Sequence, residues 1–181
     1  MKTLTAKIRR KCFISYHHED TNEVQDFIQR FDHSRDALIA RGIGAGMPGD
    51  IINSNDPDYI KRRIRENYLR DTTVTIVLIG KNTWKRRFVD WEIAASLRQT
   101  ATATPNGLVG ITLPSASALP RIIIPPRLGD NVSGRNGYAI WWEHPRDDVS
   151  LVNMIEEAYY ARTAKSILRN NRRPLQKRNA S

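Results

Sequence analysis

The feature that most constrains this fold is a run of eight residues, 73–80, with the sequence TVTIVLIG. Its side chains are mostly β-branched or apolar, and Gly80 ends the run. Runs of this kind are typical of strands that are covered on both faces, as in a parallel sheet flanked by helices. A helix predicted over residues 81–93 then begins at the carboxyl edge of the sheet, where open α/β sheets bind their ligands.

This helix carries one acid without a local partner, Glu92. None of the residues three or four positions away from it is basic. Glu92 lies at the margin of an apolar stripe that is expected to face the sheet and that consists of Trp84, Phe88, Trp91 and Ala95. A partly desolvated carboxylate needs either a partner from elsewhere in the fold or a chemical role. Position alone favours the partner, a tertiary salt bridge to one of the many arginines.

Asp90, in the same helix, has local partners. Arg86 and Arg87 precede it by four and three positions, the spacings at which ion pairs form along a helix. We therefore expect Asp90 to be a solvated surface acid.

Predicted strands and helices alternate through most of the chain. Strands are expected at residues 11–16, 37–40, 73–80, 108–113 and 138–142. Helices are expected after Asp20 and after Asp56, each acid serving as N-cap, and near residues 147–150. This pattern predicts an α/β fold of flavodoxin-like, doubly wound type, with a mainly parallel five-stranded sheet and helices on both faces. The Pro- and Gly-rich stretch 114–137 is expected to be a long loop, either functional or mobile.

The net charge of +10 lies almost entirely in the two ends of the chain. Residues 1–11 and 161–181 hold twelve of the 29 Lys and Arg residues and no acid, which leaves 17 basic against 19 acidic side chains between them. The folded body is therefore not expected to bind nucleic acid, although the tail could do so weakly. We predict a basic extension over residues 1–10, a domain over 11–168 and a solvated, partly disordered basic tail over 169–181.

The single cysteine, Cys12, cannot form a disulfide within the chain and is expected to be a small buried side chain in a reducing cytosol. No segment resembles a signal peptide or approaches membrane-spanning length. These features predict a cytoplasmic protein without membrane contact.

Two motifs match known ligand-binding patterns, but the residues around each of them argue against a ligand site. Residues 44–49 match G-x-G-x-x-G, but no helix opens within the glycines as a dinucleotide site requires, so a flexible loop over 41–55 is the better interpretation. Residues 17–20, HHED, lack a distant Cys or His at ligand spacing, so we expect a polar loop and helix cap and no metal site. The HHED cluster and Glu92 should nevertheless converge at the carboxyl edge of a parallel sheet.

Three segments carry a resemblance to a known family: residues 12–17 (CFISYH), 74–80 (VTIVLIG) and 83–93 (TWKRRFVDWEI). They are similar to the bacterial TIR-like family, in the style of the TIR proteins of Thoeris antiphage defence, with a looser match at residues 141–143. The resemblance covers about residues 11–113 and implies a flavodoxin-like TIR fold.

The resemblance also implies an activity. It implies cleavage of the nicotinamide–ribose bond of NAD⁺ with Glu92 as the catalytic acid residue and no cofactor. Phe13, Ser15 and His17 would be secondary candidates for lining the substrate pocket, although a buried core role suits Phe13 better. It further implies a cyclic ADP-ribose-type messenger, self-association on activation and a downstream effector that senses the product.

The sequence leaves a second class of function open. A non-catalytic TIR-like module would signal by assembling with itself or with other proteins, and the loop at 41–55 and the lack of a second obvious catalytic group favour it. The product isomer, the trigger and the effector are not encoded in any motif.

Overall fold

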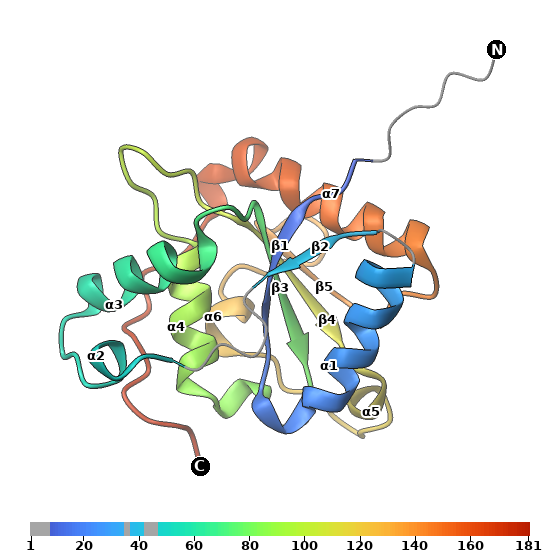
Figure 1. Ribbon diagram of the computed structural model, residues 1–181, viewed down its shortest axis with the longest axis horizontal. Coiled ribbons are helices and arrows are strands. Elements are labelled where there is room, and N and C mark those ends of the chain that lie inside the picture. The colour runs from blue at the N-terminus through green and yellow to red at the C-terminus, as the bar shows by residue number, and fades with distance from the viewer. Residues whose placement is uncertain (1–7, 35–36, 42–46) are drawn as a thin grey trace.

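The computed structural model describes residues 8–34, 37–41 and 47–181. Five strands form one sheet in the order β2-β1-β3-β4-β5, and every pairing is parallel (Figure 1). The strands are β1 (Lys11–Ser15), β2 (Ile39–Arg41), β3 (Val74–Ile79), β4 (Gly107–Thr112) and β5 (Ala139–Trp142). This is the strand order of flavodoxin-like sheets, whose switch point lies between the first and third strands. The predicted fold class is confirmed.

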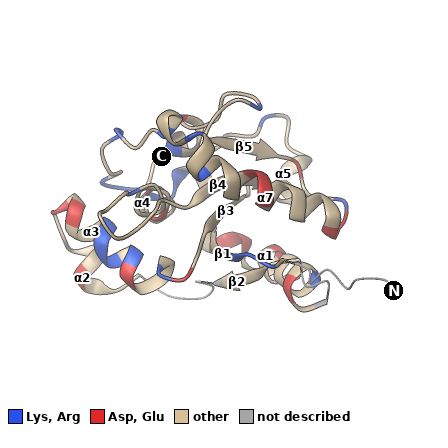
Figure 2. Cartoon of the chain, turned by 90° about the horizontal axis from the view of Figure 1, so that it is seen from above, with Lys and Arg blue, Asp and Glu red and all other residues tan. Residues whose placement is uncertain are grey.

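Helices cover both faces of the sheet, which Figure 2 shows from one end of the strands. They are α1 (Thr21–Ile28), α2 (Gly49–Ile52), α3 (Pro57–Ile64), α4 (Arg87–Ser96), α5 (Pro114–Ser117), α6 (Pro126–Gly129) and α7 (Asp148–Ala164). Wider turns η2 (Gln29–Ser34) and η3 (Arg65–Leu69) extend α1 and α3, and η1 (His18–Asp20), η4 (Thr83–Lys85) and η5 (Ser166–Leu168) are single 3₁₀ turns. α1 and α7 pack on one face, and α3, α4 and α6 on the other.

The period of two along β1 divides its side chains between these faces. Cys12 and Ile14 join the core under α1 and α7, and Cys12 is fully buried as expected. Phe13 and Ser15 point to the opposite face, toward α4. The last residue of β1, Ser15, therefore faces the helix that carries Glu92.

One of the two predicted helix caps forms, and the last helix has a cap as well. Asp56 accepts hydrogen bonds from the backbone N–H groups of Asp58 and Tyr59, with Pro57 in the first turn, and Asp147 accepts from Ser150. The predicted cap at Asp20 is wrong, because its side chain makes no capping bond to α1 and instead accepts a hydrogen bond from Thr83 Oγ1 at 3.4 Å.

The expected apolar stripe is correct for α4 but not for Trp84. This residue lies in the turn η4, because the chain is extended at Arg86 and α4 begins only at Arg87. Phe88, Trp91 and Ala95 pack toward Phe13 and α3. A second apolar side of α4, made of Val89, Ile93 and Leu97, covers β3 and β4.

The basic tail is not the solvated extension that its charge suggested. Leu175 packs against the cluster that contains Phe13 and Trp91, and the Trp91 indole N–H donates to the carbonyl of Gln176 at 2.8 Å. The Asn179 side chain accepts a hydrogen bond of 3.1 Å from the backbone N–H of the first residue of α4. Residues 169–181 thus run along α4 as part of the fold, while the predicted domain boundaries at 10 and 168 stay a prediction.

Other sequence predictions fall partly outside the described residues. The first half of the glycine motif, residues 44–46, and most of the N-terminal extension are among these, whereas residues 49–52 of the predicted loop form α2. The stretch 114–137 contains α5 and α6. In the described part of the chain, no helix combines the length and apolar character needed to cross a membrane.

Candidate functional site

Ser15 and Glu92 meet at the switch point of the sheet. Ser15 ends β1 and is fully buried, and Glu92 lies in the second turn of α4, which follows β3. The Ser15 hydroxyl donates to Glu92 Oε2 at 2.6 Å, a distance typical of a strong bond to a carboxylate. The fold therefore joins these two residues at the edge where sheets of this topology bind ligands.

Burial raises the pKa of Glu92 to about 7, even though the Ser15 hydrogen bond and the charge of Arg86 both act to lower it. Desolvation penalises the charged form of a carboxylate, and here that penalty exceeds the two stabilising interactions. Among the residues that the structure describes, no ion pair to Glu92 is found. An acid poised near neutral pH in a ligand-binding region is a strong candidate for a functional group.

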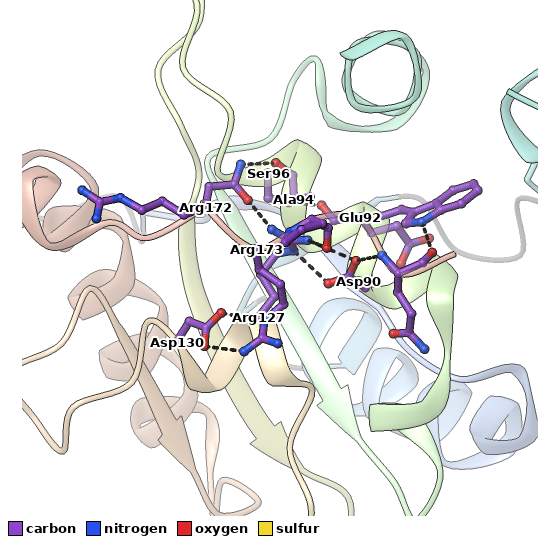
Figure 3. A network of polar contacts seen from close by, with 12 residues as sticks. Asp90, Glu92, Ala94, Ser96, Arg127, Asp130, Arg172 and Arg173 are labelled. Atoms are coloured by element: carbon purple, nitrogen blue, oxygen red, sulfur yellow. Dashed lines mark hydrogen bonds and ion pairs between the residues drawn. The ribbon is translucent and has the colours of Figure 1, made fainter. Parts of the chain in front are cut away.

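Asp90, rather than Glu92, has the tertiary salt bridge (Figure 3). Its carboxylate receives Arg127 Nε and one terminal nitrogen of the same guanidinium at 2.8 and 3.2 Å, and the backbone N–H of Gln176 at 2.8 Å. Asp90 and Arg127 are 4% and 1% exposed, so the prediction of a solvated surface acid is wrong. Local spacing could not reveal this pair, because Arg127 comes from α6, 37 residues along the chain.

Arg86 was predicted to pair with Asp90 along the helix, but its charge acts on Glu92 instead. It lies at the junction of η4 and α4, and its charge lowers the pKa of both Glu92 and His17. Its guanidinium carbon is 4.5 Å from the centre of the Phe88 ring. The pair Arg86-Arg87 in the helix motif could have indicated a basic residue near Glu92. Helical spacing suggested an ion pair with Asp90 instead.

His17 follows β1 and is only 7% exposed. Its Nδ1 accepts the backbone N–H of Glu19 at 3.1 Å, which makes it the cap of η1. Burial is the main cause that lowers the pKa of His17, so the ring is neutral at pH 7. His17, His18 and Glu19 bring one ligand atom each within 4.8 Å of one another, a grouping in which the Nδ1 of His17 is already used by the backbone.

The turn η1 is fastened to the end of β3. Asn82 donates to Glu19 at 3.0 Å, and Thr83 Oγ1 accepts the N–H of Gly80 at 2.8 Å while contacting Asp20. A Cβ on Gly80 would collide with the Asp20 carboxylate, so this glycine permits the close approach. The predicted convergence of the HHED cluster and the Glu92 region at the carboxyl edge is confirmed.

Phe13 is 1% exposed and packs in the core cluster with Trp91 and Ala95. It lies two residues before Ser15 on the same face of β1 and forms part of the apolar layer on which this end of α4 rests. Of the four candidate residues, Ser15 and Glu92 are in direct contact. The charge of Arg86 lowers the pKa of both His17 and Glu92. Phe13 supports α4 from within the core.

A buried polar chain fixes the orientation of α4. Asn106 donates to Thr75 Oγ1 at 3.2 Å, Thr75 and Ser96 lie 2.6 Å apart, and Ser96 Oγ donates to the carbonyl oxygen of Glu92 at 2.9 Å. Since Ser96 donates to Glu92, it must accept from Thr75, and every hydroxyl in the chain has a defined role. This network anchors the backbone of Glu92 to β3, and the Glu92 side chain is hydrogen-bonded to Ser15.

The fold and the site together define a TIR-like α/β domain: a parallel sheet of order 2-1-3-4-5 with one acid presented at the switch point by the helix that follows β3. The comparison with known families agrees. The family model described as "Thoeris protein ThsB, TIR-like domain" matches residues 13–118, more than half of the chain, and the protein belongs to this family of TIR-type defence proteins. No curated protein matches the sequence.

Proposed function

We propose that this protein is a cytoplasmic enzyme that cleaves the nicotinamide–ribose bond of NAD⁺ in antiphage defence, with Glu92 as the catalytic residue. The observation that carries the proposal is the state of Glu92, a partly buried carboxylate whose hydrogen-bond partner is Ser15 and whose pKa is raised to about 7. Its membership of the Thoeris ThsB TIR-like family gives this chemistry its context.

The reaction needs few protein groups. The bond between ribose C1′ and the nicotinamide nitrogen breaks, its electron pair neutralises the pyridinium ring, and the ribose is left as an oxocarbenium-like cation. A carboxylate beside C1′ stabilises that cation, much as one does in glycoside hydrolysis. Because nicotinamide leaves as a neutral molecule, no general acid is required, which fits a site with one carboxylate.

The neighbouring groups have complementary roles in this proposal. Ser15 holds the Glu92 carboxylate in one orientation, and the bond from Ser96 fixes the backbone behind it. Arg86, whose charge reaches both Glu92 and His17, is placed to attract the pyrophosphate of the substrate. His17 offers a neutral ring at the end of β1, where it can donate or accept a hydrogen bond without repelling a cation.

We further propose a cyclic ADP-ribose-type messenger, formed when a nucleophile from the adenine side of the same molecule attacks C1′ in place of water. This outcome requires that the bound substrate be folded and that water be excluded. The product would activate a partner effector, and self-association of the TIR-like domain would switch the enzyme on.

Mass spectrometry of the products from NAD⁺ tests the messenger. A product lighter than ADP-ribose by one water, formed by wild type and absent with Glu92→Gln, is expected. ADP-ribose alone would show a simple NAD⁺ hydrolase and would contradict the cyclisation step while leaving the cleavage step intact.

A further inference from the structure

A basic groove lies at the amino edge of the sheet, at the opposite end of the strands from Glu92. Its walls come from α3 and η3, from the segment after α4, and from the end of α7. Its volume is about 810 Å³, within the range of small-ligand pockets. Neither the family match nor the proposed cleavage of NAD⁺ gives this groove a function.

The charge of the groove is strongly one-sided. Five of its lining residues are arginines: Arg62, Arg65, Arg70, Arg98 and Arg162. The one lining acid, Glu66, pairs with Arg63 outside the groove at 3.0 Å. Figure 2 looks onto this edge and shows the basic residues along α3. Apart from Glu66, every titratable residue that lines the groove is an arginine, and the nearby Asp58 carboxylate interacts electrostatically with one of them, Arg98.

The hydrogen-bond partners of the Arg65 guanidinium within the described residues are backbone carbonyls and not carboxylates. Its side chain is partly buried, and its donors bind two backbone carbonyls, those of Ala95 at 3.3 Å and Thr104 at 2.6 Å. Burial lowers the pKa of Arg65, and the like charge of Arg98 lowers it further. By comparison, the buried Arg127 is neutralised by Asp90.

The composition of the groove indicates the kind of anion. Guanidinium groups bind phosphate oxygens with two parallel hydrogen bonds, and the hydroxyls of Thr100 and Thr102 at the rim are additional donors. None of the described residues that line the groove is aromatic, so the stacking platforms on which single-stranded nucleic acids depend are not found there. The groove suits phosphate groups more than bases.

We propose that this groove binds a small ligand that carries two or more phosphate groups, held between Arg65 and Arg98 and surrounded by the remaining arginines. A ligand bound here would be separate from a substrate at Glu92, because the two sites lie at opposite ends of the strands.

Isothermal titration calorimetry of the full chain with inorganic tripolyphosphate tests the proposal. Wild type is expected to bind with one-to-one stoichiometry, and Arg70→Glu combined with Arg98→Glu is expected to weaken binding by about 10- to 100-fold, since two charge-assisted contacts are reversed. Both positions are outside the core, so folding should survive. The control Arg121→Glu, an exposed arginine elsewhere, should bind as wild type does.

Three outcomes would overturn the proposal: no saturable binding by wild type, equal weakening by Arg121→Glu, or tight binding of a single-stranded RNA that tripolyphosphate fails to displace. The last would assign the groove to nucleic acid. Glu92→Gln should bind tripolyphosphate as wild type does, so failure here and failure of NAD⁺ cleavage are distinguishable.

Discussion

The hydroxyl of Ser15 donates to the carboxylate of Glu92 at 2.6 Å, across 77 residues of sequence. One residue ends the inner strand β1, and the other lies on the helix after the neighbouring central strand β3. This bond ties the catalytic candidate to the buried end of a strand within the sheet. It is also the interaction through which the protein can adjust the protonation of Glu92.

Glu92→Gln should stabilise the protein at alkaline pH. The pKa of Glu92 is about 7 in the folded protein. It is about 4.3 in an unfolded chain. The native state therefore holds a proton that the unfolded chain releases, and its stability falls as pH rises through this window. Glutamine has no charge to desolvate, so urea unfolding at pH 8 should show the variant more stable by about 1–3 kcal/mol.

At pH 4 the two proteins should unfold with nearly equal free energies, because Glu92 is then protonated in the native state and mostly protonated in the unfolded chain. The exposed Glu157→Gln is the matched control and should show no such pH-dependent difference. A Glu92→Gln variant that is less stable than wild type at pH 8 would show that the carboxylate is not held in a desolvated state.

Ser15→Ala should move the pH profile of nicotinamide release. The Ser15 hydrogen bond lowers the pKa of Glu92 against the effect of burial, so its loss raises that pKa. The reaction requires the ionised carboxylate, and its rate should rise with pH through about 7 in wild type. The midpoint in Ser15→Ala should be higher by about one unit. An unchanged midpoint with a lower plateau would assign Ser15 a role in substrate contact instead.

Asp90→Asn should release the C-terminal segment. The substitution leaves Arg127 buried without its counter-ion and weakens the bond from the backbone of Gln176. Breaking a buried ion pair on one side costs about 3–5 kcal/mol. Limited trypsin digestion should then cut the tail at its Lys and Arg residues much faster than in wild type, as measured by mass spectrometry. The exposed Asp26→Asn is the control, and equal rates in both variants would contradict the role of Asp90 as the anchor.

Leu175→Ala should destabilise the whole domain, although Leu175 lies in a segment that composition would describe as a disordered tail. Its side chain packs against the cluster of Phe13 and Trp91, and a partly buried leucine truncated to alanine costs about 1–3 kcal/mol. Chemical denaturation should show this loss, whereas Lys177→Ala should change stability by less than about 0.5 kcal/mol. An unaffected Leu175→Ala protein would mean that the tail contributes nothing to the core.

The sequence predicts this fold well where the signals are local. The run at 73–80 became the central strand β3, and the Asp56-Pro57 pair begins α3 as expected, because strand character and capping depend on neighbouring residues. The same reasoning failed for the ion pair of Asp90. Helical spacing predicted Arg86 or Arg87 as its partner, whereas tertiary packing places Arg127 beside it. Burial of the ion pair depends on α6 and on the tail, and neither has a periodic pattern that would reveal its docking.

The candidate site divides in the same way. Glu92 could be selected because its helical neighbours lack a base, whereas Ser15 was a candidate only through the family resemblance. That the two touch, and that Arg86 lies near both Glu92 and His17, depends on the pairing of β1 beside β3 and on the extended backbone at Arg86. Such long-range geometry is not recorded in the spacing of residues along one helix.

The most direct test of this account is nicotinamide release from NAD⁺ by wild type, Glu92→Gln and Glu157→Gln at high protein concentration. Release by wild type and by Glu157→Gln, with a loss of about 1,000-fold or more in Glu92→Gln, is the predicted result for a residue that stabilises the transition-state charge. Equal release by Glu92→Gln would remove Glu92 from the chemistry. No release by any of the three would contradict the assignment as an NAD⁺-cleaving enzyme and favour a TIR-like interaction module.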